Sequence, residues 1–159
     1  MAQDPSLIAY AFVKKGIREL NPVTQMKLQK MVYFAHGYHL AKYGTPLVNE
    51  QFEAWKYGPV IPSIYETYRF YGSASITDST LVPDVTHLEI GLGDLPADVQ
   101  DAIDYTWEAT KDISAMALSD WTHKAGSPWA EAFRPDTNSI PIKNDRIEEY
   151  FTGVLDANA

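Results

Sequence analysis

Ser119, Asp120 and His123 are the residues of this chain whose types could support nucleophilic catalysis. Ser119 and His123 are four positions apart, so on a helix their side chains would share a face and could hydrogen-bond, as a nucleophile and its base do. A serine nucleophile also needs an oxyanion hole and usually a strained turn of the Gly-x-Ser-x-Gly type, which this sequence lacks. We therefore interpret the pair as structural and predict no enzymatic activity, with a hydrolase as the competing hypothesis.

His36 and His39 are the candidate metal ligands, three positions apart on a predicted helix. A metal site needs further histidine, carboxylate or thiolate ligands, and no third ligand stands out near this pair. The chain contains no cysteine, which excludes disulfides, thiolate zinc sites and iron–sulfur clusters. Neither Gly-x-x-x-x-Gly-Lys nor Gly-x-Gly-x-x-Gly occurs, so a phosphate-binding loop is unsupported. We predict no metal and no cofactor.

Aromatic side chains are the most unusual feature of the first half of the chain. Aromatic residues make up 13% of the sequence. Eleven of them fall in one stretch: Tyr33, Phe34, Tyr38, Tyr43, Phe52, Trp55, Tyr57, Tyr65, Tyr68, Phe70 and Tyr71. Tyrosine and tryptophan are enriched at protein interfaces. Two interpretations stay open: an aromatic-rich core with tyrosine hydroxyls at the surface, or a protein-docking face.

Charge is divided unevenly along the chain. The formal net charge is −8, with +3 on residues 1–75 and −11 on residues 76–159. Either the two halves attract each other, or each offers a partner a different sign of charge. An acidic chain is repelled by duplex phosphates, so we expect no nucleic-acid partner. A helix-turn-helix across Asn21-Pro22 is a weaker alternative, which would make the protein a DNA-binding autoregulator.

A predicted helix from about residue 95 to 112 contains the clearest pattern. At helical spacing its carboxylates share one face: Asp94, Asp98, Asp101, Asp104, Glu108 and Asp112. Val99, Ile103 and Trp107 lie on the opposite, core-facing side. We favour a solvated outer face for the carboxylates, and the alternative is an acidic docking surface for a basic partner.

The elements that position these residues are predicted to form one compact, mainly α-helical domain over residues 1–159. It has about six helices and a small β-hairpin or short-strand element. Thr24 is the expected N-cap of the second helix. Helices are predicted over residues 6–20, 24–42, 61–71, 95–112, 114–123 and 128–133, with a last one reaching 151. Extended segments are expected over 48–55, within 81–90 and over 140–142, with a turn at 57–60.

Length and composition are those of an ordinary globular domain, with 159 residues and 45% hydrophobic residues. No apolar run approaches the roughly 20 residues that a membrane helix needs. The start, Met1 to Pro5, lacks the basic and apolar regions of a signal peptide. We expect a cytoplasmic protein without a membrane partner.

Three stretches, in this order and spacing, resemble the Panacea domain, also called the SocA-like or GepA-like phage-associated family. They are Met26–Gly37, Phe52–Tyr65 and Leu118–His123, the last followed by Ser127-Pro128-Trp129. The likeness extends over about residues 7–151. One departure is that the family often has an acidic residue shortly after the histidine of the third stretch, where this chain has Lys124-Ala125-Gly126.

The resemblance implies a non-enzymatic antitoxin that neutralises a cognate protein toxin, encoded by an adjacent gene, through direct binding. An alternative within the family is a proteolytic adaptor that delivers the toxin to a cytoplasmic protease. Residues matched to the family that we expect to contact the toxin are Lys27, Lys30, Tyr33, Trp55 and Tyr57. Residues matched with an expected structural role are Gly58, Pro59, His123, Pro128 and Trp129. Of these, Gly58 and Pro59 are expected to set the turn, Trp129 to fill the core and His123 to bond a backbone group.

Overall fold

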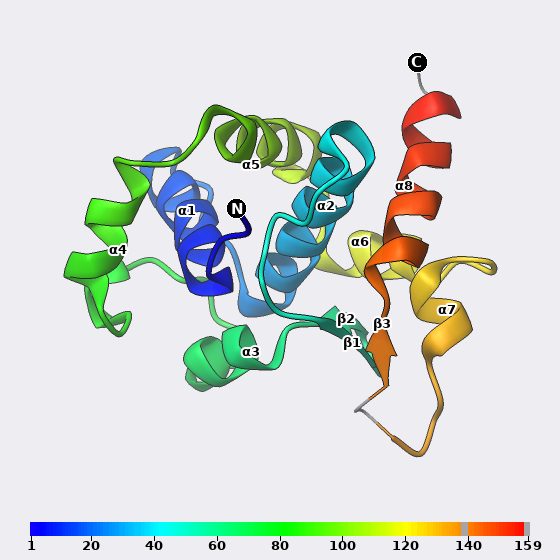
Figure 1. The fold of residues 1–159 in the computed structure, drawn as a ribbon. Coiled ribbons are helices and arrows are strands. Elements are labelled where there is room, and N and C mark those ends of the chain that lie inside the picture. The colour runs from blue at the N-terminus through cyan, green and yellow to red at the C-terminus, as the bar shows by residue number, and fades with distance from the viewer. Residues whose placement is uncertain (138–139, 158–159) are drawn as a thin grey trace.

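The fold is mainly α-helical, as the sequence predicts (Figure 1). A computed structural model describes residues 1–137 and 140–157. In these ranges there are eight α-helices rather than about six: α1 Pro5–Arg18, α2 Gln25–Tyr43, α3 Pro62–Tyr68, α4 Val85–Leu92, α5 Ala97–Thr110, α6 Ala115–Thr122, α7 Pro128–Ala132 and α8 Asn144–Ala157. The short elements are the 3-10 turns η1 Arg69–Tyr71 and η2 Ser79–Leu81 and the strands β1 Phe52–Trp55, β2 Gly58–Val60 and β3 Pro141–Ile142. No helix in these ranges is both long and apolar enough to cross a membrane.

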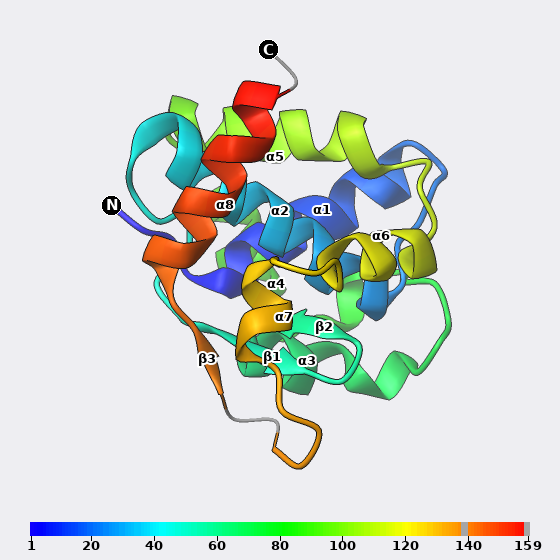
Figure 2. The same cartoon turned by 90° about the vertical axis from the view of Figure 1, so that its right-hand side faces the viewer.

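The central element is α2, which contacts α1, α3, α5, α6, α8 and β2. Figures 1 and 2 show it enclosed, with α5 on one side, the small sheet on another and α8 along its length. Its side chains from Leu28 to Leu40 are buried on nearly every face, as expected of a helix surrounded by protein. The side chain of Thr24 caps its start by accepting the Lys27 N–H, which confirms the predicted N-cap. Gly44 ends it with φ 74°, in the left-handed region that favours glycine.

The sheet is antiparallel, with strand order β2-β1-β3. β1 and β2 form a hairpin in which Trp55 faces Gly58, so the connecting turn is Lys56-Tyr57. The sequence-based turn at 57–60 was therefore placed too late, because Gly58–Val60 pairs with β1. Proline suits this strand since β2 is at an edge of the sheet, where one set of backbone groups needs no partner strand.

The expected strand within residues 81–90 is wrong. The segment forms η2 and then α4, which packs against α1. Val85, Leu88 and Leu92 are spaced three and four positions apart, which is helical periodicity, and Leu88 is buried. The spacing of these apolar residues is that of a helix and decides the outcome.

Candidate functional site

A cavity of about 530 Å³ lies between the start of α2, the β1–β2 hairpin and the beginning of α3. It is lined by Gln25, Met26, Gln29, Lys30, Trp55, Lys56, Tyr57, Val60, Tyr65, Gly72 and Ser73. We call it the Lys30 cavity. Two lysines and no carboxylate line it, although the whole chain has a net charge of −8.

The hairpin wall of the Lys30 cavity is held in place from behind by α6 and α7. The Ser119 hydroxyl donates to the Tyr57 carbonyl at 2.9 Å, and the Trp129 indole N–H donates to the Trp55 carbonyl at 2.6 Å. Gly58 permits the turn, since its φ of 126° is outside the range that other residues readily adopt. Hydrogen bonds from side chains of α6 and α7 to backbone carbonyls therefore fix the hairpin, while the Trp55 and Tyr57 side chains line the cavity. The Trp55 indole N–H donates to Glu53 at 2.9 Å.

Gln29 fixes the opposite wall. Its side-chain amide donates to the Ile61 carbonyl at 3.1 Å and accepts from the Ile61 N–H at 3.0 Å. This pair of buried bonds joins α2 to the residue preceding α3 and satisfies both backbone groups of Ile61. Gln29, which lines the cavity, is thus held in place by the segment between β2 and α3.

Lys30 lies at the floor of the cavity and is only 1% exposed. No hydrogen bond or ion pair joins its ammonium to another described residue, and burial alone lowers the pKa of Lys30 to about 8. A Cβ added at Gly58 would lie 2.9 Å from Lys30 Cε and 3.0 Å from Nζ, which shows how closely the backbone encloses the side chain. A buried ammonium without a counter-ion is costly, so this lysine does not serve the stability of the fold.

His123 is a second basic group near the first. Its ring stacks on Trp129 at a centroid distance of 3.8 Å, and its buried Nε2 atom has no partner among the described residues. Burial lowers the pKa of His123, and the charge of Lys30 lowers it further, while the charge of Asp120 and a hydrogen bond with the Tyr57 backbone act in the opposite direction. The lowered pKa favours a neutral ring, so Lys30 is the charged member of the pair at neutral pH.

The predicted contact residues separate into two groups. Lys30, Trp55 and Tyr57 line the cavity together, and the Tyr57 side chain is 62% exposed. Lys27 points elsewhere, with its ammonium donating to the Lys111 carbonyl at the end of α5. Tyr33 is 1% exposed and packs edge-on against rings of the core, so its side chain is not available on this surface.

The residues with an expected structural role all lie behind or within the hairpin. Gly58 and Pro59 belong to β2, and Pro128 is the first residue of α7, where a missing N–H costs nothing. Trp129 is 8% exposed and belongs to the core, and His123 is the residue that ends α6.

Ser119 and His123 are not arranged as a nucleophile and a base. The hydroxyl hydrogen of Ser119 is directed to the Tyr57 carbonyl, so it is not shared with the histidine ring. Ser119 is also buried within α6 rather than presented on an exposed turn. This hydroxyl fixes the hairpin.

The two histidines of α2 are fully engaged by protein groups. His36 donates from Nε2 to Asn144 at 2.9 Å and accepts the Val48 N–H at Nδ1, an arrangement that requires a neutral ring. Burial lowers the pKa of His36 to about 4. Both nitrogens of His39 face oxygen acceptors, the Thr45 carbonyl and the Asp98 carboxylate. In the part of the chain that the structure describes, no three metal-ligating side chains are grouped.

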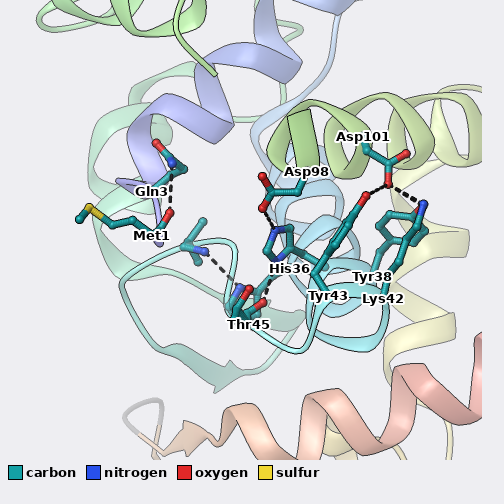
Figure 3. A network of polar contacts seen from close by, with 11 residues as sticks. Met1, Gln3, His36, Tyr38, Lys42, Tyr43, Thr45, Asp98 and Asp101 are labelled. Atoms are coloured by element: carbon teal, nitrogen blue, oxygen red, sulfur yellow. Dashed lines mark hydrogen bonds and ion pairs between the residues drawn. The ribbon is translucent and has the colours of Figure 1, made fainter. Parts of the chain in front are cut away.

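The carboxylates of α5 are used largely within the molecule (Figure 3). Asp98 bonds His39 at 2.7 Å, and one oxygen of Asp101 accepts from Tyr38, Lys42 and Tyr43. Asp104 pairs with Lys15 of α1 at 2.8 Å, and Glu108 pairs with Lys111 at 3.0 Å. The basic first half and the acidic second half therefore attract each other, and the face of α5 is not a free acidic surface.

Several cavity residues were not selected from the sequence: Gln25, Met26, Gln29, Lys56, Val60, Tyr65, Gly72 and Ser73. Gln29 and Tyr65 lie inside the stretches that resemble the family, but residue type and spacing do not indicate that they share a cavity. Only the packing of α2 against the hairpin brings them together.

Comparison with known proteins adds an independent observation. The family model described as "Antitoxin SocA-like, Panacea domain" matches residues 28–130, a range that contains all the cavity-lining residues except Gln25 and Met26. "Antitoxin SocA" of Caulobacter vibrioides (strain NA1000 / CB15N) is 35% identical over 147 residues, which cover 87% of this chain and 78% of that protein. No solved structure matches the chain.

Proposed function

We propose that this chain is an antitoxin that neutralises a protein toxin by binding it directly, because the chain belongs to the antitoxin SocA-like family with a Panacea domain. The family supports the antitoxin role, and the binding mechanism is our proposal. The toxin is expected to be the product of the adjacent reading frame. No chemistry on a substrate is required of the antitoxin.

The observation that supports direct binding is the character of the Lys30 cavity. It combines aromatic walls with two lysines in an otherwise acidic chain, and tyrosine and tryptophan are common anchors in protein interfaces. Trp55 and Tyr65 lie with ring centroids 5.0 Å apart on the same wall. Because hydrogen bonds from Ser119 and Trp129 hold the hairpin in place, binding would order few groups and lose little entropy.

The exposed ring of Tyr57 tests this placement. We expect Tyr57→Ala to weaken binding of the adjacent-gene product on the order of tenfold to a hundredfold, the range of an interface anchor. Tyr105→Ala on α5, which also has an exposed ring but lies outside the cavity, is the matched control. Calorimetry with the purified toxin measures both affinities, and growth on toxin co-expression measures neutralisation.

Two results would contradict the proposal. One is the absence of a complex between the wild-type chain and the toxin, together with failure to rescue growth. The other is rescue that requires loss of the toxin, with its half-life falling only when a cytoplasmic protease is active, which would support the proteolytic adaptor instead. We expect rescue with an unchanged toxin half-life.

A further inference from the structure

We propose that the Lys30 cavity receives an aspartate or glutamate side chain of the toxin, whose carboxylate pairs with the Lys30 ammonium. This inference rests on the proposed antitoxin function and specifies the chemistry of the contact.

The charge at the floor has no counter-ion within the described part of the chain. Lys14, Lys15 and Lys42 each pair with a carboxylate at 2.9 Å or less, although all three are more exposed than Lys30. Lys30 is buried, and no carboxylate lines the cavity. An anion supplied by a partner would remove the cost of the unpaired charge, and water excluded by the partner would strengthen the attraction.

The walls determine what accompanies the anion. Met26, Trp55, Val60 and Tyr65 present mostly apolar surface between the floor and the rim. The volume of about 530 Å³ exceeds that of one carboxylate, so apolar side chains next to it in the toxin sequence can enter as well. The occupant is therefore an acidic residue flanked by apolar ones, with a hydrophobic contact around a central ion pair.

The form of the cation favours a carboxylate over a phosphate. Lys30 carries a single ammonium and is the buried cation among the residues that line the cavity. A single lysine suits one carboxylate and lacks the paired donors that favour a phosphate.

The first test compares Lys30→Met with wild type for binding of the adjacent-gene toxin, measured by calorimetry at neutral pH. Met keeps the length and apolar stem of lysine and removes only the charge. Removing one partner of a buried ion pair leaves the other unpaired, so we expect affinity to fall on the order of a hundredfold. Lys124→Met, at an exposed lysine outside the cavity, is the control and should bind within about threefold of wild type.

A melting curve of the free Lys30→Met protein shows whether it folds, and a rise in Tm is expected because an unpaired buried charge has been removed. A folded Lys30→Met that binds within threefold of wild type would overturn the inference while leaving the antitoxin function intact. If wild type itself does not bind the toxin, the proposed function fails first and this inference with it.

The second test identifies the partner group. A carbodiimide condenses an amine with a carboxylate in contact, with loss of water, to form an amide without a spacer. Mass spectrometry of the treated complex should show Lys30 joined to an Asp or Glu of the toxin, and this product should be absent with Lys30→Met. Linkage to the toxin's terminal carboxylate, or linkage at other lysines but never at Lys30, would contradict the assignment.

Discussion

The two ends of α2 differ in whether their buried ionisable groups have partners. Toward the C-terminal end, the buried rings of His36 and His39 have partners from α5, α8 or neighbouring loops, and the exposed Lys42 pairs with Asp101 of α5. Toward the N-terminal end, Gln29 is paired with Ile61, but the buried Lys30 has no partner for its charge. We call the C-terminal end, where each of these groups has a partner and α2 contacts α5, the completed end. The N-terminal end, which faces the Lys30 cavity, is the incomplete end.

This difference separates stability from function in the molecule. The paired groups at the completed end lower the free energy of the folded state relative to the unfolded state. Their contribution to stability is a sufficient reason for their presence. An unpaired buried ammonium raises that free energy, and a partner that supplies the anion is the physical reason we propose for its presence. Four predictions test the contrast, in order of decreasing effect.

Gly58→Ala should cause the largest loss of stability, about 4 kcal/mol. The main cause is strain at a φ of 126°, and the new Cβ would also lie 2.9 Å from Lys30 Cε and 3.1 Å from Thr122 Oγ1. Gly44→Ala at the completed end is the matched control. It also has positive φ, but open space surrounds it, so only about 1 kcal/mol is expected. Urea unfolding of both variants measures the difference, and equal losses would show that contact with Lys30 contributes nothing.

Lys30→Met should stabilise the free protein at pH 7 by about 3 kcal/mol, since burial lowers the lysine pKa from 10.5 to about 8. The unfolded chain binds the proton more tightly, so wild-type stability rises as pH increases from 8 toward 10.5. The advantage of the variant should shrink over that window. Unfolding curves at pH 7, 8, 9 and 10 follow it, and a destabilised variant would mean that the ammonium has a favourable partner after all.

Acidification should lower the free energy of unfolding, because His36 at the completed end becomes protonated. Its folded-state pKa is lowered to about 4 from 6.5, so the unfolded state binds more protons between these values. Stability is therefore fully present above pH 6.5 and falls by about 2 to 3 kcal/mol as pH drops to 4. Urea unfolding across this range tests it, and His36→Gln, which cannot titrate there, should show a shallower decline. An equal slope in both proteins would exclude His36 as the cause.

Asp98→Asn should destabilise the protein by about 1 to 2 kcal/mol, because the buried His39 ring loses a charged hydrogen-bond acceptor. The loss is limited because the Asp98 side chain is partly exposed and water screens its charge. Asp94→Asn, at an exposed carboxylate on the same stripe, should change stability by less than about 0.5 kcal/mol. Thermal melts of the two variants compare a paired with a solvated member of the α5 stripe. Identical shifts would mean that the pairing with His39 adds no stability.

The helical class, most helix positions and the Thr24 cap could be predicted from the sequence because they depend on residues three or four positions apart. The same local rule, applied to Val85, Leu88 and Leu92, would have identified α4 as a helix. The family resemblance likewise relied on short stretches in order, and the matched range of 28–130 confirms it.

The tertiary structure decides which charged side chains pair with each other. Composition indicated a basic first half and an acidic second half, but left open whether the α5 carboxylates meet α1 and α2 or a partner. Contacts such as His39 with Asp98, fifty-nine positions apart, decide this through packing. Likewise, the sequence placed Lys30, Tyr33 and Trp55 in one candidate face, whereas the fold puts Tyr33 in the core and leaves Lys30 in a cavity without a counter-ion. Periodicity and caps are short-range properties, but burial and pairing depend on segments that only folding brings together.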